Sequence, residues 1–232
     1  MHWDVVIRNF DYFLLGAWPA GPMGGLLMSI LLALGGIFGA FWLGLLFGLM
    51  RMSRNAWVRL PALVYIEIIR GTPLLLLIFW FYFLAPVVLG KTLPSFQSSL
   101  IAFIVFTGAY IAEIVRAGVQ ALPKGQMEAA RGSGLTHVQA MRYVILPQAL
   151  RNMIPSFVNQ FVSLTKDTSL ASLIGVNELM LTADQVNNRE LTAPMEIFIT
   201  VAVLYFVVCY VLTSASRRLE RQLARYQARG KR

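Results

Sequence analysis

The sequence predicts an all-α, polytopic membrane protein with five transmembrane helices, and three observations lead to this fold class. Apolar residues make up 57% of the 232 residues and charged residues only 13%, and the mean hydropathy is +0.65. A soluble domain has about 45–50% apolar and about 25% charged residues, so the composition excludes an ordinary soluble domain. Long charge-free windows recur along the chain, and basic residues gather between alternate windows.

The windows define the spans, because a helix needs about 20 apolar residues to cross a hydrocarbon core of about 30 Å. No charge falls within residues 12–50, 71–90, 92–112 or 197–216, and the adjacent pair Lys166-Asp167 is the only interruption of 152–177. We therefore expect spans at about 22–50, 60–85, 98–119, 150–175 and 195–216. The glycine pairs Gly35/Gly39 and Gly44/Gly48 predict close helix packing by the first span.

Basic residues set the orientation, because the cytoplasmic side of a membrane protein carries the excess of Lys and Arg. Fifteen of them flank or follow the spans on one side, including a tail that ends in Lys231 and Arg232, and only Arg8, Lys91 and Arg189 fall on the other. The N-terminus is therefore expected outside and the C-terminus in the cytoplasm. The net charge of +9 then reflects topology and contact with anionic lipid, not nucleic-acid binding.

Some charged residues fall inside or at the ends of the proposed spans: Glu67, Arg70, Glu113, Lys166 and Asp167. A charge costs about 2.5–3.5 kcal/mol at the centre of a lipid-facing helix, so these residues should face protein or water. Glu67 and Arg70 are three residues apart and can pair on one helix face, as can Glu113 and Arg116. We interpret the second pair as structural.

Two of these charged sites adjoin predicted helix breaks. Arg70 precedes Gly71-Thr72-Pro73, where the proline removes a backbone N–H and disfavours helix at Thr72. Lys166-Asp167 precedes Thr168-Ser169. Broken helices in membranes line cavities or are buried in protein, so we interpret both segments as parts of a solute pathway. Five helices hardly enclose such a pathway, and a second subunit, identical or paralogous, is expected.

Residues 120–149 form a patterned polar loop. Pro123 can start a helix through Arg131, which Gly132 and Gly134 end. Thr136 with Gln139 predicts a capping box for a second helix over 137–146, with Pro147 as its end.

This loop carries a family resemblance. The segments Glu128-Ala129-Ala130, Gly134 and Val144-Ile145-Leu146-Pro147 resemble the EAA loop of ABC importer permeases, with Val144 where Ile is usual. The segments 65–73, 109–118 and 166–170 are similar to those of the polar amino acid uptake family, the histidine-permease type. The resemblance implies a type I ABC permease fold, two cytoplasmic ATPase subunits, a periplasmic binding protein and a bacterial inner membrane location.

The resemblance also implies roles for individual residues. The ATPase-coupling set is Glu128, Ala129, Ala130, Gly134, Leu146 and Pro147. The substrate-pathway set rests instead on the charges beside the helix breaks, and it is Glu67, Arg70, Thr72, Lys166, Asp167, Thr168 and Ser169. The segment Gly90-Lys91-Thr92 lacks the remainder of a P-loop, so ATP and Mg²⁺ belong to partner subunits and this chain is expected to hold no cofactor and to be no enzyme.

The charges suit any amino acid, since Arg70 or Lys166 can meet its carboxylate and Glu67 or Asp167 its ammonium. Residues 10–16 and 80–83 and the pair Gly24-Gly25 look like glutamate/aspartate permeases, so acidic substrates are expected. Basic or amide amino acids (arginine, histidine, glutamine) are the alternative. Two other hypotheses are a secondary transporter coupled to an ion gradient through Glu67 or Asp167, and a scaffold without a solute site.

Overall fold

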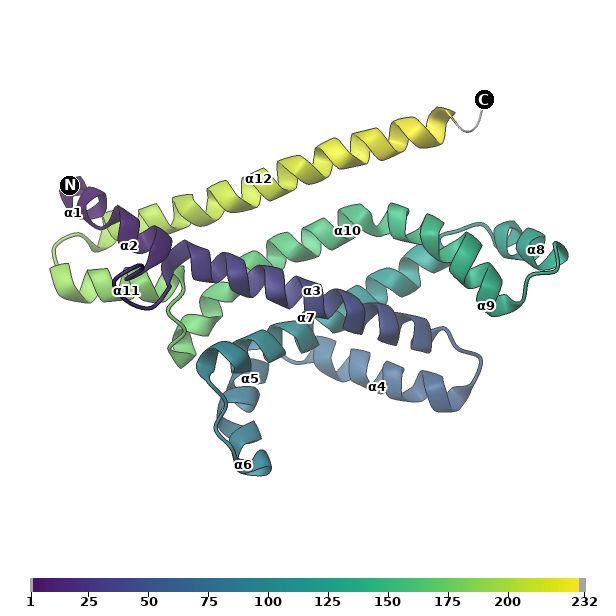
Figure 1. Cartoon of the computed structure of the whole chain (residues 1–232), viewed down its shortest axis with the longest axis horizontal. Coiled ribbons are helices and arrows are strands. Elements are labelled where there is room, and N and C mark those ends of the chain that lie inside the picture. Colours follow the sequence, from purple (N-terminus) through teal and green to yellow (C-terminus); the bar gives the residue numbers. More distant parts are fainter. Residues whose placement is uncertain (1, 230–232) are drawn as a thin grey trace.

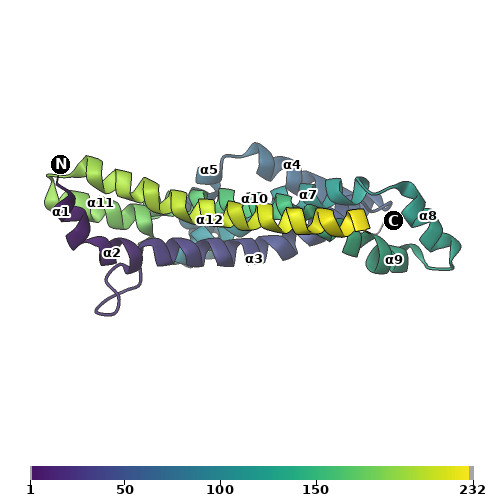
Figure 2. The ribbon, with the colours of Figure 1, turned by 90° about the horizontal axis from the view of Figure 1, so that it is seen from above.

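The computed structural model describes residues 2–229, and every regular element in that range is helical. Long helices lie side by side in an elongated bundle (Figure 1). Short helices gather at its two ends, with α1 (Trp3–Arg8), α2 (Phe10–Leu15) and α11 (Leu179–Glu190) at one end and α8 (Lys124–Gly132) and α9 (His137–Ala140) at the other (Figure 2). The predicted all-α class is confirmed.

Three helices are long and apolar enough to cross a membrane within residues 2–229. They are α3 (Gly25–Arg51), α7 (Ser95–Gln120) and the Pro194–Arg218 part of α12 (Pro194–Arg229). A bent pair, Ala56–Gly71 with Leu74–Val88, would make a fourth crossing if it counts as one span. These elements agree with the predicted first, third and fifth spans.

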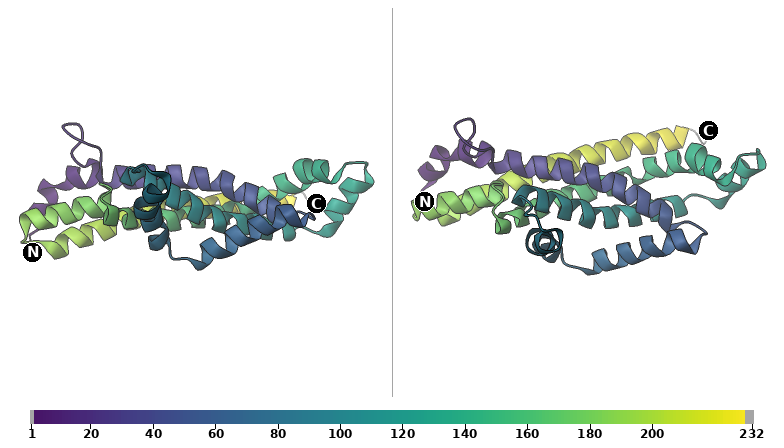
Figure 3. Two further views of the ribbon diagram at one scale, coloured as in Figure 1. Left: turned by 90° about the horizontal axis from the view of Figure 1, so that it is seen from below. Right: turned by 60° about the horizontal axis from the view of Figure 1, so that its bottom comes forward.

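The predicted second span is not one continuous helix. α4 (Ala56–Gly71) ends before Thr72, and α5 (Leu74–Phe79), the π-helical turn η1 (Trp80–Leu84) and α6 (Ala85–Leu89) follow in a direction bent by 108° from it. Figure 3 shows this second half projecting from the side of the bundle. Thr72 is extended, with ψ 135°, because the ring of the following proline disfavours helical backbone there.

The predicted fourth span also differs. α10 (Leu146–Asp167) is followed directly by the 3₁₀ helix η3 (Thr168–Ile174), and α10 is not among the helices apolar enough to cross a membrane. Five crossings and the side that each terminus faces therefore stay predictions. α1 and the C-terminal part of α12 do lie toward opposite ends of the bundle (Figure 1). Lys231 and Arg232 lie outside the described residues.

α3 and α7 pack closely along most of their length, as the glycine pairs predicted. A Cβ atom on Gly44 would lie 2.5 Å from Ile111 Cγ2 and 2.7 Å from the Gly108 carbonyl oxygen. On Gly48 it would lie 2.8 Å from the Ala112 carbonyl oxygen. A larger residue at either position would push the two helices apart and remove dispersion contacts along the seam.

Candidate functional site

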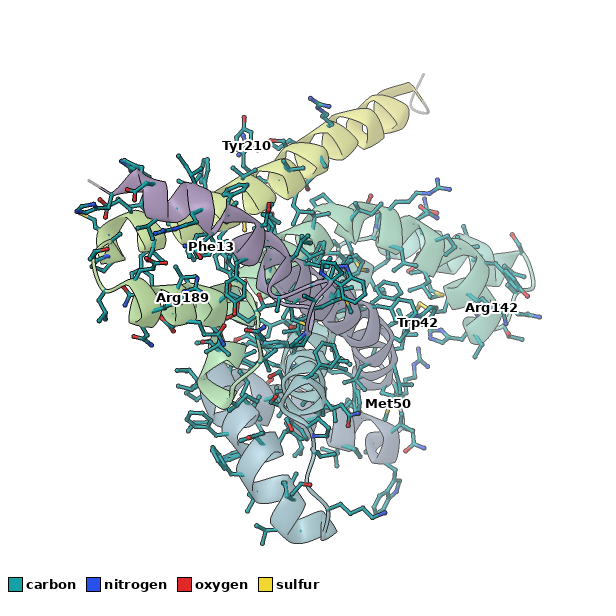
Figure 4. The ribbon with its side chains drawn as sticks, turned by 60° about the vertical axis from the view of Figure 1, so that its left-hand side comes forward. Phe13, Trp42, Met50, Arg142, Arg189 and Tyr210 are labelled. Carbon is teal, nitrogen blue, oxygen red and sulfur yellow. The ribbon has the colours of Figure 1, made fainter. Side chains whose placement is uncertain are left out.

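The predicted coupling loop forms a projecting helical hairpin at one end of the bundle. Glu128 and Ala129 on α8 are exposed, whereas Ala130 is buried. Arg142, labelled in Figure 4, lies at the same end, opposite Arg189 on α11. The exposed face of α8 therefore belongs to an accessible surface and not to the packed core.

Gly134 ends α8 in the manner that its position predicted. Its φ is +87°, and the N–H groups of Gly134 and Leu135 donate to the carbonyl oxygens of Arg131 and Ala130 at 3.1 and 3.3 Å. This pair of bonds is a Schellman motif, which satisfies carbonyl groups at the helix end and needs a left-handed residue. Gly134 thus fixes the direction in which the chain leaves α8.

The second helix of the loop begins as predicted but does not end where predicted. Thr136 Oγ1 accepts from the Gln139 N–H at 3.3 Å, and Gln139 Oε1 accepts from the Thr136 N–H at 2.8 Å. After α9 the chain continues through the π-helical turn η2 (Met141–Ile145) into α10. Pro147 does not close a helix, because at the start of α10 its missing N–H removes no bond that the helix needs.

Two hollows flank this hairpin. One of about 420 Å³ lies between the end of α7 and α8, and its lining includes Leu122, Pro123 and Met127. The other, of about 480 Å³, lies between α3 and α9 and includes Leu49 and Leu146. Leu146 thus lines a hollow beside the hairpin.

The charged residues of the predicted pathway form a network that one arginine organises. Arg51 at the end of α3 donates to Glu113 Oε2 on α7 at 2.9 Å and to Glu67 Oε1 on α4 at 3.0 Å. Arg116 Nε donates to both Glu113 oxygens at 3.1 Å, which confirms the predicted Glu113–Arg116 pair. Within residues 2–229 Glu67 pairs with Arg51 and not with Arg70, so that prediction was wrong. The sequence interpretation had counted Arg51 only as a topology signal.

Arg70 lies beside the helix break, over the face of an aromatic ring. Its Cζ is 5.5 Å from the centroid of the Tyr110 ring, and its Nη1 is 3.9 Å from Glu113 Oε2. The next polar group, Thr72 Oγ1, donates to the Ile68 carbonyl oxygen at 2.8 Å. The break in the helix is therefore held by local hydrogen bonds, and part of the Arg70 guanidinium stays exposed.

The other predicted pathway segment lies where α10 tightens into η3. Lys166 is exposed, Asp167 and Ser169 are half-buried and Thr168 is fully buried. The hydroxyl groups of Thr168 and Ser169 donate to the carbonyl oxygens of Thr165 and Lys166, each at 2.8 Å. Neither Lys166 nor Asp167 forms an ion pair with another residue in the described part of the chain.

Both breaks pack against one hydrophobic cluster, but their polar groups do not meet. Ile69 and Leu74 flank the first break, Leu164 and Ala171 flank the second, and all four belong to this cluster. Within residues 2–229 no ion pair or hydrogen bond joins the charged groups at one break to those at the other. A solute bridging the two segments would have to supply that connection.

One buried carboxyl group was not among the residues that the sequence singled out. Glu178 is fully buried, and it accepts from Leu181 N–H at 3.0 Å, Tyr205 O–H at 2.8 Å and Ser29 O–H at 3.2 Å. It therefore caps α11 and ties it to α3 and α12. Burial raises the pKa of this carboxyl group. The available signal was an acidic residue just before the apolar start of α11.

Known proteins resemble this chain over nearly its whole length. The L-cystine transport system permease protein TcyB of Bacillus subtilis (strain 168) is 42% identical over 98% of this chain and 93% of its own length. The glutamine transport system permease protein GlnP of Escherichia coli (strain K12) is 38% identical over 93% and 98%. These relatives are permease proteins, components that translocate solutes and are not themselves enzymes.

Solved structures agree with this likeness. The crystal structure of an amino acid ABC transporter with histidines matches with a TM-score of 0.84 and 34% identity, over 96% of this chain and 99% of that chain. The MetNI methionine ABC transporter matches at 22% identity with a TM-score of 0.70, which supports the fold alone. The all-helical fold is therefore that of a type I ABC permease.

The family assignment rests on a match that covers most of the chain. The model of the binding-protein-dependent transport system inner membrane component matches residues 36–225, which include the coupling loop and both helix breaks. The chain therefore belongs to the family of inner membrane components of binding-protein-dependent transport systems.

Proposed function

We propose that this chain is the permease subunit of an ATP-driven importer of polar amino acids without net charge, of the glutamine or cystine type. The observation that carries the proposal is the full-length similarity to the cystine and glutamine permeases, at 42% and 38% identity. The expectation of glutamate or aspartate receives no support from these relatives. The alternative that the sequence left open, basic or amide amino acids, fits the known relatives better, and its amide class includes glutamine.

The partners follow from the same proposal. A second permease subunit, identical or paralogous, completes the pathway, and two cytoplasmic ATPase subunits bind and hydrolyse ATP with Mg²⁺. A binding protein delivers the substrate on the outer side. The exposed Glu128 and Ala129 on α8 support docking of this helix on an ATPase subunit, with Gly134 fixing its direction and Leu146 and Pro147 connecting it to α10.

The pathway passes the two helix breaks. Arg70 and Lys166 each present a cationic group with an exposed part, and Asp167 presents a carboxylate that forms no ion pair within residues 2–229. A zwitterionic amino acid can satisfy one group of each sign. Glu67, Thr72, Thr168 and Ser169 complete the proposed set. The three hydroxyl groups bond to carbonyl oxygens three or four residues earlier, and Glu67 bonds to Arg51.

The test is uptake by the assembled importer. The chain is purified with the permease, ATPase and binding protein encoded beside it and reconstituted in liposomes. Uptake of radiolabelled glutamine, cystine, glutamate, arginine and histidine is measured with and without ATP. We expect ATP-dependent uptake of glutamine or cystine. Uptake of glutamate alone would overturn the substrate class, and uptake that follows a sodium or proton gradient without ATP would overturn the ABC mechanism.

A second experiment isolates the coupling helix. Glu128→Trp is expected to reduce co-purification of the ATPase, because a bulky side chain on the docked face of α8 prevents close approach. Asn188→Trp, an exposed position on α11 at the opposite end, is the matched control. Equal ATPase recovery in both variants would count against the coupling role of α8.

A further inference from the structure

α10 carries a line of polar residues along one face. Ser156, Asn159, Ser163 and Lys166 are spaced by three, four and three residues, so they share one helix face. Ser156, Asn159 and Lys166 are exposed and Ser163 is half-buried. We call these four residues the α10 polar face.

The other sides of α10 are already occupied. Ala149 and Met153 are buried in a cluster with residues of α3 and α7, including Ala40 and Val115. On another side, the Val162 carbonyl oxygen faces Cys209 of α12. At about 100° per residue, Asn159 and Lys166 point between these two sides, about 80–100° from Ala149. Ser156 lies within about 20° of Ala149 around the helix and is exposed all the same.

This face differs from the exposed faces of the neighbouring long helices. α3 exposes Phe38 and Trp42, and α12 exposes Phe206 and Val203. Those faces suit lipid, whereas a lysine at mid-membrane facing lipid would cost about 2.5–3.5 kcal/mol.

We propose that the α10 polar face lines the aqueous pathway on the cytoplasmic side of the membrane and guides the substrate from the helix break at Lys166 toward the interior. The inference rests on the proposed function and on the predicted orientation, in which α10 leads from the coupling loop to mid-membrane. Ser156 and Lys166 are ten residues apart, which is about 15 Å along a helix, or half of the hydrocarbon core. Serine and asparagine offer hydrogen bonds to water and to a zwitterion without binding either tightly.

The test uses single cysteines in the assembled importer with Cys209, the one native cysteine, replaced by Ala. Ser156→Cys and Asn159→Cys probe the polar face, and Phe38→Cys and Phe206→Cys are exposed controls on α3 and α12. A membrane-impermeant thiol reagent is added to inside-out and right-side-out vesicles. We expect the polar-face cysteines to react at least about tenfold faster than the controls in inside-out vesicles, because the reactive thiolate forms where water reaches it.

Two outcomes would overturn the inference. Polar-face cysteines that react no faster than the controls would place this face in a dry environment. Disulfide cross-links between two permease subunits at Ser156→Cys or Asn159→Cys, combined with slow labelling of the same cysteines, would assign this face to a dry subunit interface. Uptake is measured in the same vesicles before labelling. If the vesicles import amino acids but the polar-face cysteines do not react, the lining role is rejected and the proposed function stands. If the cysteines react but the vesicles import no amino acid, the proposed function is rejected and the lining role stands.

Discussion

Glu113 is the anion on which three guanidinium groups converge. Arg51 comes from the end of α3, Arg70 from the end of α4 and Arg116 from the same helix as the carboxylate. Its side chain is 24% exposed, so the bonds are partly shielded from water. The three guanidinium groups stabilise the contact between α3, α4 and α7 only while the Glu113 carboxylate lies between them. Without that anion the guanidinium groups repel one another.

We expect Glu113→Gln to destabilise the protein by about 1–3 kcal/mol, since it leaves the guanidinium groups without a counter-charge in a partly buried site. The measurement is thermal unfolding of the detergent-purified importer. Glu67→Gln is the control, because Glu67 is 57% exposed and meets only Arg51 within the described residues, so its loss should cost less than about 1 kcal/mol. Equal losses in both variants would contradict the central role of Glu113.

Glu178, at the end of the bundle that holds α11, is expected to make stability depend on pH. Burial raises its pKa, so above the ordinary value of about 4.3 the unfolded chain has released a proton that the folded chain still holds. The folded state binds more protons in that interval, and stability therefore falls as the pH rises through it. The loss is complete once the pH exceeds the raised pKa of the folded state.

We expect Glu178→Gln to remove this pH dependence while keeping an acceptor for the Leu181 N–H. Thermal unfolding midpoints measured from about pH 4 upward should fall more steeply for the wild type than for the variant. Glu190→Gln, an acidic residue near the other end of α11 that pairs with Arg8, serves as the control and should keep the wild-type slope. Parallel curves for the wild type and Glu178→Gln would contradict the assignment.

At the scale of elements, two glycines at the end of α8 differ in backbone conformation: Gly132 is the last residue of the helix, and Gly134 follows it by two residues. A Cβ atom on either Gly132 or Gly134 would meet no other atom within 4 Å, but only Gly134 has a positive φ. Gly132→Ala should stabilise the helix by up to about 1 kcal/mol, because alanine loses less conformational freedom. Gly134→Ala should destabilise it by about 1–2 kcal/mol, because a Cβ atom strains the left-handed conformation.

The two substitutions are compared by thermal unfolding and by ATPase co-purification. We expect Gly134→Ala to lower both the unfolding midpoint and ATPase recovery, since it changes the direction in which the chain leaves α8. Gly132→Ala should lower neither. A loss of ATPase binding with Gly132→Ala alone would instead indicate that contact area on α8, and not the Schellman motif, determines docking.

The two prolines Pro73 and Pro147 show which helix boundaries the sequence could predict and which it could not. Pro73 indicated a helix break at Thr72, and the structure has a break there. The 108° bend at this break could not be predicted from the sequence, because it depends on the packing of α5 against α7. Pro147 was interpreted as a helix end and instead lies in the first turn of α10, because a preceding π-helical turn connects the two helices. A proline removes helical hydrogen bonds only on its N-terminal side. Whether it ends a helix or begins one therefore depends on which of the two helices contains it.

The candidate site was predictable where the chemistry is local. The capping box of Thr136 and Gln139 and the left-handed Gly134 depend on neighbouring residues, and both are present. The partners of Arg51 and Glu178 lie on other helices, and a single sequence carries no information about which helices meet. The ion pair between Arg51 and Glu67 and the burial of Glu178 therefore required the three-dimensional structure.

At the scale of the whole molecule, the contacts between α3 and α7 constrain the topology. Gly35 of α3 lies against Leu100 of α7, and Gly48 lies against Val115, so contact positions increase together along both helices. The two helices therefore run parallel. α7 has 26 residues and is about 39 Å long, enough to cross a core of about 30 Å. If α3 and α7 cross in the same direction, residues 52–94 must return the chain across the membrane despite the bend at Thr72.

We therefore expect the bent pair to be a true crossing and not a re-entrant loop. In the Cys209→Ala background, Lys91→Cys should react with an impermeant thiol reagent in right-side-out vesicles, together with Asn188→Cys on α11. Arg54→Cys, in the loop between α3 and α4, should react only in inside-out vesicles. All three positions are exposed, so labelling reports the side of the membrane. Labelling of Lys91→Cys from the same side as Arg54→Cys would make the bent pair re-entrant and reduce the crossings to four.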